Sequence, residues 1–107
     1  MKETIMKGYK ALSKEGKALF GDGMGYRVGK WYKMRSNARI KSCKQGYHFF
    51  TSLADIFITF CPETIDVYEV EAKGRIVEDE FTAGKYACSE IKLVRKLDNS
   101  EIEKYIK

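Results

Sequence analysis

The order of apolar and polar residues along the chain predicts mainly β-strands. Residues 65–72 show it most clearly, because Val70 and Ala72 fall on one face of a strand while Glu69 and Glu71 fall on the other. Other segments rich in aromatic and β-branched residues show the same alternation in shorter form. Further strands are predicted over residues 4–11, 24–34, 37–42, 46–50, 86–95 and, after a turn at Gly74, 75–79.

One helix stands out between these strands. Ser52 is followed three residues later by Asp55, which is the spacing of an N-terminal capping box. The residues that follow are apolar almost all round, a pattern typical of a helix without a solvent-facing side. Pro62 then ends the pattern, because proline cannot continue a helix. We therefore expect a largely buried helix over about residues 52–61.

The end of the chain carries a second helix signal. Asp98 and Glu101 repeat the capping-box spacing and predict a short helix over residues 98–107, with Ile102 facing inward. The connections between the predicted strands are short and hairpin-like, which favours antiparallel pairing. The sequence thus predicts an α+β fold: a mostly antiparallel sheet of five to seven strands, one buried helix and a short C-terminal helix, in a single domain over residues 1–107.

Composition and charge narrow the range of functions. The chain has 107 residues, and no apolar run approaches the roughly 18 residues that a membrane span needs. The first ten residues lack the apolar stretch of a signal peptide, so we expect a cytoplasmic protein that does not enter a membrane. Lys and Arg number 20 against 15 Asp and Glu, a formal charge of +5 that attracts nucleic acid or an acidic protein.

The three cysteines do not indicate a disulfide framework or a metal site. Their number is odd and no two are close in sequence, so we expect reduced thiols. With His48 they make up four candidate zinc ligands, but no pair has the spacing that zinc sites show. We therefore predict no bound metal. The cysteines are Cys43, Cys61 and Cys88.

The candidate catalytic residues are few. His48, the only histidine, can be read as a general base, or as a strand residue whose ring bonds a neighbouring group. Ser52 lies close in sequence, but no third group is assigned to orient it. Glu80 and Glu90 are the candidate catalytic carboxylates near the last predicted strand, although neither lies in a clear catalytic context. The glycine-rich stretch 21–25 has the composition of a hairpin turn and lacks the ending of a phosphate-binding loop.

Basic and aromatic residues alternate in one segment. Such residues anchor protein interfaces and also stack on nucleic-acid bases. Because the other basic residues are scattered, nucleic-acid binding is only the third candidate function. The predicted binding residues are Arg27, Lys30, Trp31, Lys33 and Arg35.

Several sequence blocks together resemble a family of small phage and prophage domains without an assigned function. The resemblance covers about residues 6–97, and the block around Gly46-Tyr47-His48-Phe49 is its most specific part. It implies a phage origin and a location in the host cytoplasm, but no activity. The blocks are Lys7-Gly8-Tyr9-Lys10, Tyr26-x-Val28-Gly29-Lys30-x-Tyr32, Cys43-x-x-Gly46-Tyr47-His48-Phe49, Glu69-Val70-Glu71-Ala72-x-Gly74 and Lys85-x-Ala87-x-Ser89-x-Ile91.

A weaker resemblance points to ADP-ribosyltransferases. The aromatic run 46–50 ending in Thr51-Ser52, the helix after it and the strand 67–74 look like the middle of that fold. The resemblance implies NAD as the cofactor. The first strand departs from the family's pattern, because it offers Lys7 or Lys10 where the family has arginine or histidine.

These observations give three candidate functions. The first is a phage- or prophage-encoded accessory protein that binds a host or defence protein without catalysis and needs no cofactor; anti-CRISPR inhibitors belong to this class. The alternative is a minimal or degenerate NAD-dependent ADP-ribosyltransferase. The third is a nucleic-acid-binding protein. The sequence does not give the oligomeric state.

Overall fold

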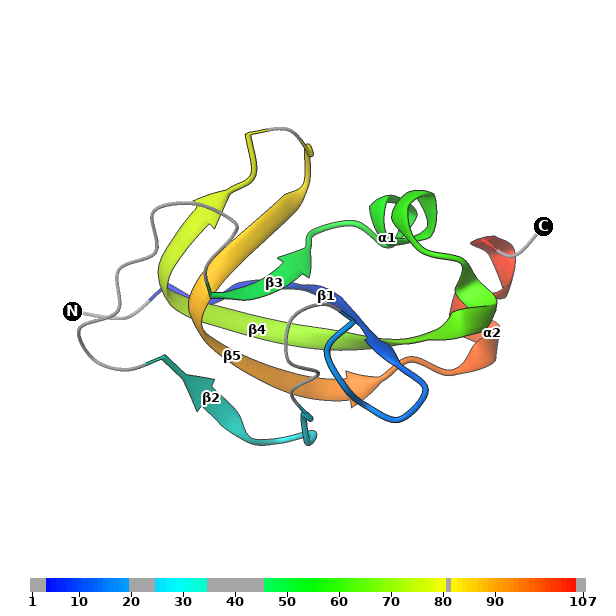
Figure 1. Ribbon diagram of the computed structural model, residues 1–107, viewed down its shortest axis with the longest axis horizontal. Helices are drawn as coiled ribbons and strands as arrows, with labels where there is room; N and C mark the ends of the chain where they lie inside the picture. The colour runs from blue at the N-terminus through cyan, green and yellow to red at the C-terminus, as the bar shows by residue number, and fades with distance from the viewer. Residues whose placement is uncertain (1–3, 20–24, 35–45, 81, 106–107) are drawn as a thin grey trace.

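The computed structural model describes residues 4–19, 25–34, 46–80 and 82–105. The predictions for Arg35, residues 37–42 and Cys43 lie outside these ranges. The described chain forms a five-stranded antiparallel sheet with short helices, which confirms the α+β class (Figure 1). The elements are β1 Met6–Ser13, β2 Trp31–Lys33, β3 Tyr47–Phe50, α1 Leu53–Thr59, η1 Pro62–Thr64, β4 Ile65–Glu78, β5 Lys85–Lys96, α2 Asn99–Ile102 and η2 Glu103–Tyr105.

The sheet curls until its strands close a ring. β1 pairs with β4, β4 with β5, β5 with β3, and β3 again with β1, while β2 pairs with β5 alone. β3 and β2 pair with the same edge of β5, one after the other. β3 pairs with the first residues of β5, and β2 pairs with a later stretch. The β1–β3 contact that completes the ring has one register pair, Tyr9 with Phe50. Ring closure therefore depends on a very short seam.

Two extra residues help the two longest strands to bend. Glu69 pairs with Arg95 and Val70 with Leu93, so Val94 is an extra residue on β5. The second irregularity lies at Gly74 on β4, where φ is +80°. The predicted turn at Gly74 is therefore wrong: the strand runs through the glycine, which takes the left-handed conformation of a bulge.

The apolar residues form two packed groups, one on each face of the curled sheet. The first contains Leu12, Phe49 and Leu93, all fully buried, and is bordered by several tyrosines. The second contains Ala11, Phe50 and Val67 together with Ile56 of α1 and Ile102 of α2. These two helices lie at one end of the sheet (Figure 1). No helix in the described part of the chain is long and apolar enough to cross a membrane.

Helix α1 is shorter and more exposed than the sequence predicts. It spans Leu53–Thr59, and only Ile56 in it is buried, whereas the side chain of Ile58 is 82% exposed. The prediction of a largely buried helix over 52–61 is therefore not confirmed. A helix of two turns at the end of a sheet can bury only one side, whatever its composition. The strand predicted over residues 24–34 is also shorter in the structure, where β2 has only three residues.

The glycine in β1 is a position where ring closure can be tested. A Cβ atom on Gly8 would lie 2.5 Å from the carbonyl oxygen of Phe50 and 2.7 Å from the ring of Phe49, both on β3. We predict that Gly8→Ala lowers the free energy of unfolding by about 1 to 3 kcal/mol, because β1 and β3 must move apart. Denaturant unfolding measures this. Gly25→Ala is the control, because a Cβ there meets nothing within 4 Å. Equal stability of both variants would contradict the prediction.

The two capping boxes that the sequence predicts differ in the structure. The Asp98 side chain accepts a hydrogen bond from the Glu101 N–H, and the Glu101 side chain accepts one from the Asp98 N–H. Ser52 stands at the N-cap of α1 but makes no side-chain cap bond.

We therefore predict that Asp98→Ala costs about 1 kcal/mol of unfolding free energy, while Ser52→Ala costs less than about 0.5 kcal/mol. Thermal melting of the two variants provides the measurement. A larger loss in the serine variant would show that the two caps have been assigned the wrong way round.

Candidate functional site

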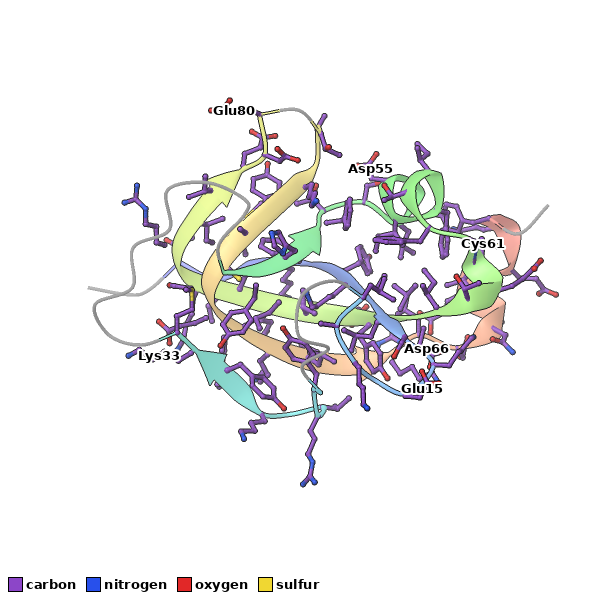
Figure 2. The ribbon with its side chains drawn as sticks, viewed as in Figure 1. Glu15, Lys33, Asp55, Cys61, Asp66 and Glu80 are labelled. Carbon is purple, nitrogen blue, oxygen red and sulfur yellow. The ribbon has the colours of Figure 1, made fainter. Side chains whose placement is uncertain are left out.

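The segment leading into β2 carries an exposed basic strip, defined here as Arg27, Lys30 and Lys33 with Val28 between them. All four side chains are exposed, Val28 to 52%. No ion pair to Arg27, Lys30 or Lys33 is found among the described residues. Figure 2 shows Lys33 on β2 at the outside of the fold. The strip is thus a positively charged surface with one apolar side chain, and its cations face no carboxylate partner in the part of the chain that the structure describes.

Hydrogen bonds fix the backbone of this strip to the sheet. The Gly29 N–H donates to the Leu93 carbonyl at 2.8 Å, and the Met34 N–H donates to the Ser89 carbonyl at 3.0 Å. Near its start, the Arg27 N–H donates to the Tyr32 hydroxyl at 2.8 Å. Since β5 holds the segment at both ends, the basic side chains are presented on an ordered backbone. An ordered surface loses less conformational entropy when it binds.

Trp31 has a different position from the other predicted binding residues. Its ring is half-buried and lies 4.3 Å from the Lys73 amine and 5.2 Å from the Lys92 amine, as ring-centroid distances. These lysines are in turn paired with Glu90 at 4.0 Å and Glu71 at 3.3 Å. Trp31 therefore attaches β2 to the outer face of β4 and β5 through cation–π contacts.

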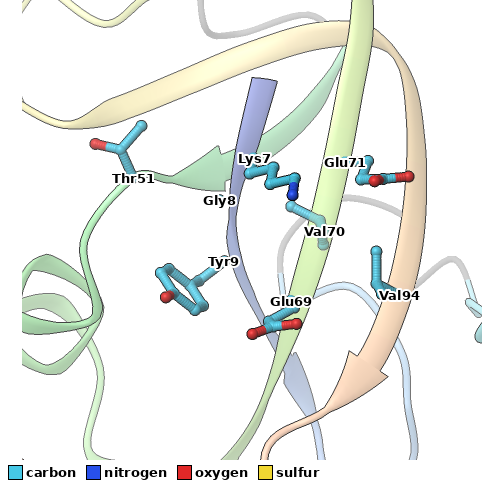
Figure 3. A pocket seen from close by; sticks show the side chains of 8 residues that line it. All are labelled: Lys7, Gly8, Tyr9, Thr51, Glu69, Val70, Glu71 and Val94. Carbon is cyan, nitrogen blue, oxygen red and sulfur yellow. The ribbon is translucent and has the colours of Figure 1, made fainter. Parts of the chain in front are cut away.

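A polar groove of about 290 Å³ lies on the same face, over β1 and β4 (Figure 3). Figure 3 shows Lys7 and Tyr9 projecting from β1, with Glu69 and Glu71 on the neighbouring strand. Sequence reasoning placed the two glutamates on a solvent face and did not find the groove. The sequence signal that could have indicated the groove is the alternation within β1. It places the polar Lys7 and Tyr9 on the same strand face as the buried Ala11. The remaining lining residues are Gly8, Thr51, Val70 and Val94.

The structure does not assemble the predicted catalytic residues into one site. His48 lies in β3, and Ser52 occupies the N-cap position of α1 without a side-chain cap bond. Glu80 is exposed after β4, and Glu90 on β5 faces Lys73. Phe50, in the aromatic run that resembles the middle of the ADP-ribosyltransferase fold, is 4% exposed and packs into the core. The groove is lined by none of the four candidates.

His48 is held in its neutral form. Burial lowers the pKa of His48 to about 4, and the nearby charges of Lys10 and Lys85 add to that shift, while Asp79 opposes it. An imidazole with this pKa remains neutral near pH 7.

No group of three potential ligands for a metal is found within the described ranges. Cys61 is exposed, while Cys88 is buried. Burial raises the pKa of the Cys88 thiol to about 12, so it stays protonated. Cys43, the remaining ligand of the zinc set considered in the sequence analysis, lies outside the described residues.

Lys10 is the buried charged residue of the described core. Its side chain is directed into the interior of the closed sheet. There the amine donates to the His48 carbonyl at 2.5 Å and lies 5.3 Å from the centroid of the Tyr26 aromatic ring. Burial lowers the pKa of Lys10 to about 8, and the Lys85 charge adds to this, while Cys88 opposes it.

The lowered pKa of Lys10 predicts a pH-dependent stability. Between about pH 8 and 10.5 the unfolded chain keeps the proton that the folded chain has lost, so stability rises with pH across this window. We predict that wild type gains about 3 kcal/mol relative to Lys10→Met between these limits. Denaturant unfolding of both proteins at several pH values tests this. A difference that does not change with pH would contradict it.

Comparison with known proteins identifies a family but no function. Neither the curated proteins nor the solved structures include a match to this chain. One family model matches residues 6–105, nearly the whole chain. This agrees with the expectation of a domain family without an assigned function. The chain belongs to the DUF7666 family, a domain of unknown function.

Proposed function

We propose that this domain is a non-enzymatic binding module whose basic strip docks onto an acidic surface of a partner protein. The observation that carries the proposal is that Arg27, Lys30 and Lys33 have no ion-pair partner within the described ranges and lie on a backbone that β5 holds in place. Charges at the rim of an interface steer association and select partners of opposite sign. Val28, exposed in the middle of the strip, adds an apolar contact.

A protein partner fits this surface better than a nucleic acid. Single-stranded nucleic acids bind where exposed aromatic faces stack on bases. Here Trp31 lies against two lysines, and the Tyr32 hydroxyl and ring are occupied by Arg27 and Lys30. The strip therefore offers charge and shape but no open stacking platform.

The biological setting we propose rests on the sequence blocks that resemble those of small phage and prophage domains. In that setting the partner is a host or defence protein in the cytoplasm, and the module acts by occupying its surface, as anti-CRISPR inhibitors do. No cofactor is required for such a role.

A charge-reversal series tests the proposal. We expect Arg27→Glu/Lys33→Glu to retain fewer than about a tenth of the partner molecules that wild type captures from host lysate, because attraction becomes repulsion. Capture is read by quantitative mass spectrometry at low salt and at about 0.5 M salt, which screens exposed charges.

Lys104→Glu is the control, because it reverses an exposed charge on η2, away from the strip. A specific partner is lost in the double variant and kept in this control. Equal capture by wild type, variant and control would place the binding surface elsewhere and overturn the proposal.

A further inference from the structure

We propose that the outer edge of β2 binds an acidic, extended segment of the partner by strand addition. This inference rests on the proposed function and specifies how the basic strip would hold its partner. β2 is the end strand of the described sheet, since it pairs with β5 on one side only. Strand addition uses the main-chain groups of such an edge for affinity and the side chains for specificity.

The ladder between β2 and β5 shows which backbone groups are available. Met34 donates its N–H to Ser89, so these two residues form a hydrogen-bonded pair of the antiparallel ladder. Such pairs alternate, which places Tyr32 opposite Ile91 in the next bonded position. The N–H and C=O groups of Trp31 and Lys33 therefore point away from β5. They form a row to which an added strand can pair.

The side chains on the two faces of β2 favour acidic residues in that strand. Lys33 shares the outer face with Trp31, beside the lysines of β4 and β5. Lys30 lies over the ring of Tyr32, 5.1 Å from its centroid, on the other face. An added strand therefore meets a cation on each face. Cross-strand pairs of opposite charge stabilise a sheet, while like charges directly opposite destabilise it.

The same charges argue against a second copy of this chain as the occupant. Pairing two β2 edges would bring Arg27, Lys30 and Lys33 of both copies together. Lysines on edge strands are a common means of preventing such self-association. The occupant is thus a different chain, and its charge is opposite to that of the strip.

The test compares two substitutions at one residue. Lys33→Ala removes the charge, whereas Lys33→Pro removes the charge and the N–H that points outward. The probe is a fluorescent seven-residue peptide, Thr-Glu-Val-Glu-Val-Glu-Thr, and its control is the same peptide N-methylated at alternate residues. Fluorescence polarisation at low salt gives the dissociation constants.

We expect Lys33→Ala to weaken binding about threefold and Lys33→Pro at least about tenfold more, with no binding of the methylated peptide. Equal affinity of the alanine and proline variants, or of the two peptides, would overturn strand addition. So would a peptide that does not bind wild type. The docking of a folded acidic surface would survive these results, because the charge-reversal series tests it separately.

If Lys33→Pro does not fold, hydrogen exchange replaces it. Strand addition predicts that the peptide slows exchange at the Trp31 and Lys33 amides of wild type about tenfold, with a smaller change at Tyr32, whose N–H already faces β5. Unchanged exchange at both outward amides would overturn the proposal.

Discussion

The close contact of β1 with β3 is the constraint on which the fold depends. A four-strand ring of antiparallel pairs can close only if its first and third strands meet, and here they share a single register pair. The Lys10 amine supplies a second link across this seam, through its bond to the His48 carbonyl. Gly8 allows the approach, because any side chain there would collide with Phe49 and Phe50.

This closure explains why a charged group lies in the core. A buried amine loses its hydration, and part of that cost is recovered by the carbonyl it binds and the Tyr26 ring beneath it. The lowered pKa of Lys10 reflects the part of the desolvation cost that these contacts do not recover. An apolar side chain at this position would avoid the cost but would remove the hydrogen bond that joins β1 to the His48 carbonyl.

The sequence predicted the strands well where a pattern depends on neighbouring residues alone. The alternation in β1, β4 and β5 and the Asp98 capping box were read correctly because each is a local property. The extent of β2, the exposure of Ile58 and the passage of β4 through Gly74 depend on how the sheet curls. The groove was missed for the same reason: Lys7, Tyr9, Glu69 and Glu71 become neighbours only through the β1–β4 register. Arg27, Lys30 and Lys33 were predicted as binding residues from the alternation of basic and aromatic residues in one segment, and the structure shows that their side chains are exposed.

The pairing of charges separates the cations that hold the sheet from those available to a partner. Asp66 on β4 pairs with Lys14 and Lys96, and Arg95 on β5 bridges Glu69 to Glu101 of α2. Together with the lysine pairs beside Trp31, these bonds lie along the two long strands. They compensate charges that sheet formation brings together.

Outside this network, the cations of the basic strip have no carboxylate partner among the described residues. Exposed ion pairs contribute little to stability, so pairing these charges within the domain would hardly change the free energy of unfolding. Their unpaired state is instead what an acidic partner requires, because a cation already neutralised by its own sheet would attract such a partner only weakly.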